Sequence, residues 1–466
     1  MSSEQNLPAH FGEFVVALDL QSMPPRIVER ARALLLNGYA IGLGARDSQT
    51  VSDARDAARL QGLLSAGGAT ILGLRTRVNL TAAMQANATL LHARVQDDTL
   101  GSSHFGTVVI PTLTAMAEAG ESSMTNFLPA LVAGYEVGGA LDRELTGRVT
   151  AAGFRGTMVF GTIAAAASAA RFLGLPAHQI ATAIGMAASF TGGTLQSFVD
   201  GTDEWRFQPA VAATLGYAAA TFAASGATAS VNSLDGLYGL SGAFAGAAGA
   251  LAEIPGSLGR EWEVERVRVK PFPVAMFNQS VVHAAQTLRG RIADLQPVRI
   301  SVELHPFEAE YPGIALQGPF ESSAGALMSA PRCVALTLVD GAPTLANLEN
   351  NKSASVAALA ALTAVVAAPS LERLACRLIA DCADGSRFEV AARTAPSDAF
   401  DMRAAQDVLH SICKELAIPI VATDGLRNFV KALPHGDIND VVDAFAMGVT
   451  DEGIGEPRTS GRRTRA

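Results

Sequence analysis

WEVERVRVKPFPV, residues 262–274, is the stretch at which the spacing of apolar residues in this 466-residue chain changes. Upstream of it, apolar residues recur at helical spacing, first from Pro25 to Gly42 and then in the same style as far as Leu251. From Trp262 onward, charged residues alternate with valine, which is the pattern of a half-buried strand. The change predicts a mainly α protein, in which a helical bundle is joined to a smaller α+β region.

The helical part is built largely from small side chains. Three Ala-rich apolar runs follow one another, over Ala130–Leu141, Val159–Leu173 and Pro176–Gln196. Ala and Gly let helices approach closely, so a packed bundle is predicted. The segment from Pro209 to Leu234 carries no charge and is mostly Ala, Gly, Thr and Ser. Burial of such residues contributes little transfer free energy, so we expect a pair of core helices there rather than a membrane helix.

The smaller region reads as strands and helices in turn. Strands are predicted within PVRISVELHPFE (297–308), CVALTLVDG (333–341) and RLACRLIADCADGSRFEVAAR (373–393), the last around an Asp-Gly turn. Helices are expected over Gln279–Leu295 and Ser353–Val366.

The helical pattern returns after Arg393, at Ala404–Leu416 and Val441–Met447. The α+β region is therefore predicted to be inserted into the helical one. The expected division is a helical domain formed by 1–267 and 399–455, an α+β lid domain over 268–398, and a disordered tail over 456–466.

Composition narrows the classes of partner and compartment. The formal net charge of −9 argues against nucleic acid or an anionic membrane as partner, because both require clustered Lys and Arg. The four cysteines show neither CxxC nor Cys/His ligand spacing, which predicts free thiols in a reducing compartment and no zinc site. The first residues, MSSEQNLPAHFGEF, lack the basic start and apolar core of a signal peptide, so a cytoplasmic location is expected.

A cluster of polar residues precedes one of the Ala-rich helical regions, in QDDTLGSSHFGTVVIP (96–111). Asp97, Asp98, Thr99 and His104 fall within eight positions, separated by glycine and serine, which places them on a loop. Binding and catalytic groups concentrate on loops. The alternative is that the Asp and Thr residues cap a helix and that the histidine is structural.

Several motifs in order resemble one family. They are QDDT with His104 and Gly106, GYEVGGALDR from Gly134, GFRGT from Gly153, SLDGLYG from Ser233, VKPFP from Val269, and ALMSAPRCVAL from Ala326. Together they resemble the MmgE/PrpD family, which includes 2-methylcitrate dehydratase, cis-aconitate decarboxylase and iminodisuccinate epimerase. The resemblance implies an all-helical domain with a smaller lid domain, a homodimer, no metal or organic cofactor, and a site between the two domains. It places the polar site residues at Asp98, Thr99, His104, Arg155, Arg206, Lys270 and Arg332.

The chain departs from the family pattern at several of these places. Members that dehydrate or decarboxylate commonly read GFHxT, whereas GFRGT here puts Arg155 in place of the imidazole. The usual SLPYxVA reads SAPRCVA, with Arg332 in place of a tyrosine. The Lys-Arg-Leu-His-Ala-Gly element appears as EWRFQP, with Gln208 at the histidine position, and the first acid of the DFDD pattern is Val95.

These departures remove proton-handling groups and add guanidinium groups, which bind carboxylates bidentately. They favour an epimerase of a polycarboxylate similar to iminodisuccinate. Arg155, Arg332 and Arg206 would bind carboxylates, and Lys270 and His104 would act as acid and base on opposite faces of the reacting carbon.

Two further residues of the polar loop, Asp98 and Thr99, also have predicted roles. Asp98 would orient the histidine or act as a base, and Thr99 would donate a hydrogen bond to a carboxylate. The competing function is a lyase acting on a tricarboxylate, of the 2-methylcitrate dehydratase or cis-aconitate decarboxylase type. A third possibility is a non-catalytic protein that binds a polycarboxylate or only dimerises. Arg155 could instead form a structural ion pair with Asp97 or Asp98, and Lys270 could be a solvated strand end.

Overall fold

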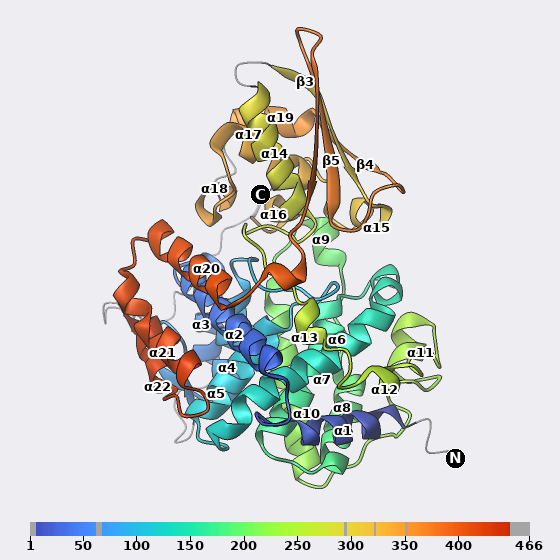
Figure 1. Ribbon diagram of the computed structural model, residues 1–466, viewed down its shortest axis with the longest axis vertical. Coiled ribbons are helices and arrows are strands. Elements are labelled where there is room, and N and C mark those ends of the chain that lie inside the picture. Colours follow the sequence, from blue (N-terminus) through green and yellow to red (C-terminus); the bar gives the residue numbers. More distant parts are fainter. Residues whose placement is uncertain (1–5, 62–67, 293–295, 321–322, 350–352, 448–466) are drawn as a thin grey trace.

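The computed structural model describes residues 6–61, 68–292, 296–320, 323–349 and 353–447. Figure 1 shows a large helical body with a smaller region, containing a sheet, that stands on one end of it. The described part is mostly helical, which confirms the predicted fold class at that level.

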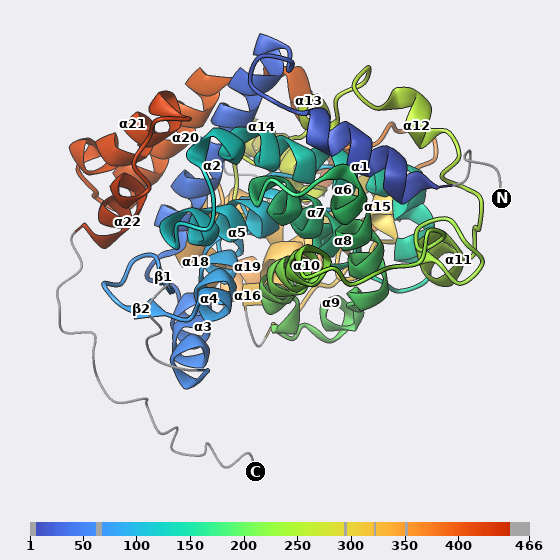
Figure 2. The ribbon, with the colours of Figure 1, turned by 90° about the horizontal axis from the view of Figure 1, so that it is seen from below.

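The helical body takes its elements from both ends of the described chain. They are α1 (Leu7–Ala17), α2 (Pro25–Ala45), α3 (Gln49–Leu60), β1 (Ala69–Thr70), β2 (Arg77–Val78), α4 (Leu80–His92), α5 (Gly106–Glu118), η2 (Met124–Asn126), α6 (Phe127–Ala151), α7 (Gly156–Phe172), α8 (Ala177–Phe190), α9 (Gln196–Asp200), η3 (Glu204–Phe207), α10 (Gln208–Ala224), α11 (Leu240–Ala245), α12 (Ile254–Ser257), α13 (Glu263–Arg266), η4 (Ser397–Ala399), α20 (Met402–Glu415), η5 (Ile420–Thr423), α21 (Asp424–Ala432) and α22 (Asn439–Ala446). Figures 1 and 2 show the C-terminal helices α20 to α22 lying beside α2.

Helix α7 lies in the middle of the body, buried along nearly its whole length and in contact with α5, α6, α8 and α10. Small side chains make this possible. A Cβ added at Gly216 of α10 would lie 2.4 Å from the Cβ of Ala165 and 2.6 Å from the carbonyl oxygen of Thr162. Glycine therefore sets the close approach of α7 and α10.

The sheet region (residues 274–393) holds a four-stranded sheet with helices on one side (Figure 1). Its elements are α14 (Asn278–Ile292), β3 (Pro297–Leu304), α15 (Pro306–Ala309), α16 (Ser323–Met328), α17 (Ala330–Asp340), α18 (Leu345–Glu349), α19 (Ala354–Ala361), β4 (Thr363–Ala367), β5 (Ala375–Cys382) and β6 (Arg387–Arg393). The strand order is β4-β3-β5-β6, with β3 and β4 parallel and the other neighbours antiparallel.

Two large apolar clusters underlie these regions. One joins the helices before α14 to α20, α21 and α22, and the other fills the sheet region. The second cluster also includes Val95, Leu195, Phe198 and Trp205 of the helical body, so it continues across the junction. The predicted domain boundaries remain a proposal, which these two clusters support. The predicted tail, 456–466, lies outside the described residues.

Two predicted strands, one predicted helix and one predicted helix pair need correction. Residues 262–274 do not form a strand: Glu263–Arg266 is the short helix α13, because the buried Glu136 carboxylate accepts hydrogen bonds from the amides of Glu263 and Val264, at 3.0 and 2.9 Å. CVALTLVDG lies in helix α17, whose first turn is capped by the Ser329 hydroxyl. Its apolar residues face the second apolar cluster as a helix stripe rather than as a strand face.

Ser353–Val366 divides into α19 and β4, because Thr363 and the residues after it pair in parallel with β3. The uncharged segment 209–234 holds one helix, α10, and continues as turns after Ala224. The strands β3, β5 and β6 are confirmed, and the turn between β5 and β6 uses Gly385 at φ +86°. No helix in the described ranges has the length and the apolar character needed to cross a membrane.

Candidate functional site

A small cavity of about 40 Å³ lies where the sheet region meets the helical body. Both regions contribute to its wall. The lining residues are Val95, Thr99, Gly101, Ser102, His104, Arg155, Phe198, Trp205, Lys270, Ala275, Met276, Phe277, Tyr311 and Met328. Four of the predicted site residues, namely Thr99, His104, Arg155 and Lys270, are therefore brought together.

The polar loop is joined to the segment that carries Lys270. The amide of Thr99 donates to the carbonyl of Arg268 at 2.7 Å, and the amide of Arg268 donates back at 2.8 Å. The Gln96 side chain donates to the carbonyl of Pro271 at 2.9 Å. These bonds explain the strand-like alternation in residues 262–274. The extended backbone after α13 pairs with the polar loop rather than with a sheet.

Asp97 is the centre of the site, although it lies behind the cavity wall. Its Oδ2 lies 3.3 Å from Lys270 Nζ and 2.8 Å from His104 Nδ1, and its Oδ1 lies 3.2 Å from His92 Nδ1. Burial by itself would raise the pKa of Asp97. The three basic groups outweigh burial and hold this pKa well below its usual value, so the carboxylate is charged.

Lys270 is fully buried, which contradicts a solvated strand end. Its Nζ also donates to the carbonyl oxygen of Val95 at 2.8 Å. Val95 has a φ of +55°, a conformation that is costly for a β-branched residue, and this turn presents its carbonyl to the ammonium group. Burial lowers the pKa of Lys270, and the Asp97 carboxylate opposes that shift.

His104 has one ring nitrogen that can accept a proton. Its Nδ1 lies 2.8 Å from the carbonyl oxygen of Asp98 and 3.2 Å from Thr99 Oγ1. A carbonyl oxygen only accepts hydrogen bonds, so Nδ1 carries the proton and the lone pair is on Nε2. Burial lowers the pKa of His104, and the nearby Lys270 charge lowers it further, which favours the neutral base.

Arg155 lines the cavity without forming either of the ion pairs considered from the sequence. Its Nη2 lies 2.9 Å from His92 Nε2, and its Nη1 donates to the Trp205 carbonyl and, at 3.3 Å, to Gln208 Oε1. The guanidinium also lies 5.3 Å from the Trp205 ring centroid. Arg155 reaches Asp97 only through His92.

Asp98 points away from the cavity. Its Oδ2 accepts a hydrogen bond from the Tyr135 hydroxyl at 2.5 Å, and its Oδ1 accepts one from the Gly106 amide at 3.2 Å. Burial raises the pKa of Asp98 to about 6, against the effect of the Tyr135 hydrogen bond. The predicted orienting role belongs to the backbone carbonyl of Asp98 rather than to its carboxylate.

Neither of the other two predicted guanidinium groups lies on the cavity wall. Arg206 donates to the carbonyl of Ala93 at 2.9 Å and pairs with Asp203 at 3.2 Å. Arg332 is buried in α17, where its amide bonds to the cap residue Ser329. The predicted trio of carboxylate anchors is therefore not assembled around this cavity.

Sequence reasoning missed two residues of this site. His92 lies at the end of α4, five positions before Asp97, and that short spacing was the available signal. Tyr311 comes from the sheet region, where its ring lies 5.0 Å from Phe277 and 6.3 Å from Phe198. Burial raises the pKa of Tyr311 to about 12, so its hydroxyl is a proton donor.

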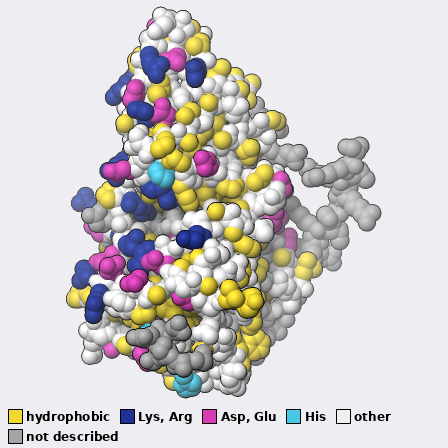
Figure 3. All heavy atoms as spheres, turned by 90° about the vertical axis from the view of Figure 1, so that its right-hand side faces the viewer, with side chains coloured by type: hydrophobic (Ala, Val, Ile, Leu, Met, Phe, Trp, Pro, Cys, Tyr) yellow, Lys and Arg dark blue, Asp and Glu magenta, His cyan; other side chains and the backbone are white. Residues whose placement is uncertain are grey.

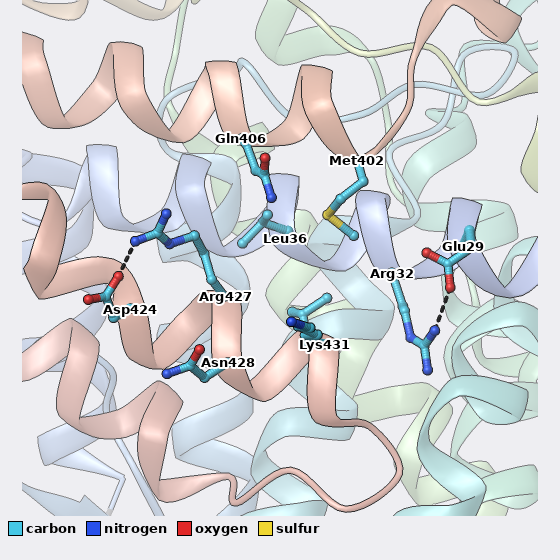
Figure 4. Close-up of a pocket in the computed structure, with 10 residues that line it drawn as sticks. Glu29, Arg32, Leu36, Met402, Gln406, Asp424, Arg427, Asn428 and Lys431 are labelled. Atoms are coloured by element: carbon cyan, nitrogen blue, oxygen red, sulfur yellow. Dashed lines mark hydrogen bonds and ion pairs between the residues drawn. The ribbon is translucent and has the colours of Figure 1, made fainter.

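A larger hollow of about 690 Å³ lies between α2, α20 and α21 (Figure 4). Two of its cations are already paired with carboxylates of the same hollow, Arg32 with Glu29 and Arg427 with Asp424. None of the predicted site residues lines it, so the smaller cavity is the candidate site.

Comparison with known proteins gives two matches. Residues 9–250 match the MmgE/PrpD N-terminal domain. A cis-aconitate decarboxylase-like protein of Aspergillus oryzae is 28% identical over 286 residues, which cover 57% of this chain and 58% of that protein. The chain thus aligns with little more than half the length of that relative.

Proposed function

The chain belongs to the MmgE/PrpD family, and on that premise we propose that it is an enzyme that transfers a proton at a carbon next to a carboxylate of a polycarboxylate substrate. One observation carries the proposal: Lys270 and His104 line one cavity, and Lys270 Nζ and His104 Nδ1 meet at one oxygen of Asp97 behind its wall. A carbanion next to a carboxylate needs a base and a cation within reach at the same time. This cluster offers both.

The hydrogen bonds support separate roles for the two groups. His104 is the base, because its Nδ1 proton is shared between the Asp98 carbonyl and Asp97 Oδ2, and its Nε2 lone pair remains. Lys270 donates to Val95 and to Asp97, and an ammonium group has a third N–H for a substrate oxygen. Lys270 therefore stabilises the negative charge that develops when the α-proton leaves.

Further donors surround the same cavity. Arg155 and Thr99 are available for substrate carboxylates, and Tyr311 supplies a phenol from the sheet region. Burial keeps that phenol protonated, so it can protonate a leaving group or a carbanion.

A lyase acting on a tricarboxylate is the favoured reaction. Only Arg155 of the three predicted guanidinium anchors lines the cavity, which weakens the case for a tetracarboxylate. In dehydration, His104 takes the α-proton and Lys270 or Tyr311 protonates the departing hydroxyl group to give water. In decarboxylation, the electrons of the broken carbon–carbon bond stay on the substrate, CO₂ leaves, and the same donors protonate the carbon. The partial match to a decarboxylase-like protein supports this choice.

Epimerisation of an iminodisuccinate-like substrate is the second candidate. Arg155 at the family's imidazole position favours it, since a permanent cation binds a carboxylate and does not transfer protons near neutral pH. Donors from two regions of the protein, His104 and Tyr311, would serve the two faces of the carbon.

The test is turnover in deuterated water, followed by NMR. The substrates are 2-methylcitrate, cis-aconitate and an enantiopure N-substituted aspartate. We expect a new alkene or CO₂ release from a tricarboxylate, with a loss of at least about 100-fold in Lys270→Met and in His104→Gln. His410→Gln, an exposed residue of α20, is the matched control. Deuterium exchange without loss of a group would select the epimerase. Full activity in both site variants would refute the proposed proton transfer.

A further inference from the structure

His92 joins Arg155 to Asp97, yet it does not line the cavity. Arg155 Nη2 lies 2.9 Å from His92 Nε2, and His92 Nδ1 lies 3.2 Å from Asp97 Oδ1. Guanidinium nitrogens only donate hydrogen bonds, so Nε2 must accept and Nδ1 must carry the proton. The contacts fix His92 as a neutral imidazole that donates to Asp97.

The surroundings hold this ring in place. His92 is fully buried, and its ring meets the Trp205 ring edge-on, with centroids 5.2 Å apart. The His104 ring lies 5.5 Å away on another side. A buried imidazole between an arginine and a carboxylate has little freedom to turn.

We propose that His92 is a positioning residue of the proposed proton-transfer site, which fixes the Asp97 carboxylate by binding Oδ1 so that Oδ2 holds Lys270 and His104 together. This inference rests on the proposed function. Without the hydrogen bond from His92, Oδ1 has lost its donor and the carboxylate can rotate. A displacement of about 1 Å in such a cluster can cost about 100-fold in rate.

Two variants of similar shape separate the hydrogen bond from packing. In His92→Asn, the amide nitrogen replaces Nδ1–H as the donor to Asp97. His92→Leu has a similar branched shape and no donor. Both lack Nε2, so only the hydrogen bond to Asp97 differs between them.

The first readout needs no substrate. The chain has four lysines, so selective ¹³C labelling of lysine gives a small set of NMR signals from which the titration of Lys270 can be followed. Without the donor, the negative charge of Asp97 is stabilised by fewer hydrogen bonds and attracts the Lys270 ammonium group more strongly. We therefore expect the pKa of Lys270 to rise in His92→Leu and to stay near the wild-type value in His92→Asn. The same pKa in both variants would overturn the proposal.

The second readout separates this inference from the proposed function. If a polycarboxylate is turned over, kcat should fall about 100-fold in His92→Leu. The fall in kcat should be about ten times smaller in His92→Asn, and KM should be nearly unchanged in both variants. If none is turned over, the proposed function fails while the lysine titration still decides the role of His92. Should His92→Leu not fold, ¹⁵N-histidine NMR of the wild-type protein tests the geometry: a neutral Nδ1–H form from pH 5 to 9 supports it, and a titrating ring or an Nε2–H form overturns it.

Discussion

At the scale of single residues, the site depends on one buried carboxylate. Asp97 binds three basic groups, and removing its charge would leave Lys270 buried without its counter-ion. We predict that Asp97→Asn lowers the free energy of unfolding by about 3–5 kcal/mol at pH 7. Urea denaturation measures this, with Asp407→Asn, an exposed change in α20, as the control.

The pH dependence of that difference follows from the direction of the pKa shift. The pKa of Asp97 lies well below its ordinary value of 3.8, so the stabilisation is complete above 3.8 and is lost as the pH falls toward the lower folded value. The gap between wild type and Asp97→Asn should stay constant from pH 8 to pH 5 and narrow below pH 4. An equal stability of the two proteins at pH 7 would show that Asp97 is not the centre of the cluster.

At the scale of elements, helix α6 holds the polar loop through side-chain hydrogen bonds. Tyr135 binds Asp98, and Asp142 accepts a hydrogen bond from the Ser103 hydroxyl at 2.5 Å. Burial raises the pKa of Asp142 to about 7, against the effect of that hydrogen bond. The loop that carries His104 is therefore held by two side chains of α6, and the charge of one of them, Asp142, is costly to bury.

Asp142→Asn tests this support. Because the folded pKa is raised from 3.8 to about 7, the wild-type protein loses stability as the pH rises between those values, and the neutral variant does not. We predict that the variant gains stability over the wild type between pH 5 and pH 8, on the order of a few kcal/mol. Thermal unfolding at the two pH values measures the gain. A difference that does not change with pH would mean that Asp142 is charged throughout.

Helix patterns were the most predictable part of the fold. The periodic runs of α2, α7 and α20 fall close to their predicted ranges, since packing in the body agrees with the local pattern, whereas α6 extends ten residues beyond the predicted end at Leu141. In α17, tertiary contacts decided instead: CVALTLVDG alternates like a strand, yet the Ser329 cap and a helical apolar stripe place it on the second apolar cluster.

The candidate site was predictable where a short motif carries the residue, even when two such motifs lie far apart in sequence. Thr99, His104 and Lys270 line one cavity as expected. Asp98 and Asp97 are adjacent in sequence, and only the turn after Val95 decides which carboxylate faces Lys270. Tyr311 reaches the cavity by tertiary packing of the sheet region, which the sequence pattern does not reveal.

At the scale of the whole molecule, charge is unevenly distributed. Residues 207–234 carry no charge, and a hollow of about 850 Å³ beside them is lined only by uncharged residues. Large apolar side chains are exposed around it, with Phe222, Leu237 and Tyr238 at 52%, 68% and 93%. Figure 2 shows α8 and α10 side by side, with α11 nearer the edge of the body, and Figure 3 shows charged side chains gathered toward one edge of the face it presents.

We propose that the homodimer implied by the family resemblance forms through this uncharged face, because such apolar exposure favours association. The prediction is that Phe222→Glu converts a dimer into a monomer in light scattering after size exclusion. Leu60→Glu places the same charge at an exposed leucine of α3, away from this face, and should leave the dimer intact. A wild-type protein that is monomeric at all concentrations would contradict this proposal.

In the proposed site His104 takes the proton from carbon, Lys270 stabilises the negative charge that develops, and Asp97 holds the two side chains together. The most direct test of this assignment is a crystal structure of the full chain with citrate as the bound tricarboxylate. We predict one citrate carbon within about 3.5 Å of His104 Nε2 and an oxygen of the adjoining carboxylate within about 3 Å of Lys270 Nζ, with Asp97 still bonded to both residues. Citrate bound outside the cavity would contradict this assignment. So would a structure in which Lys270 and His104 do not both contact Asp97.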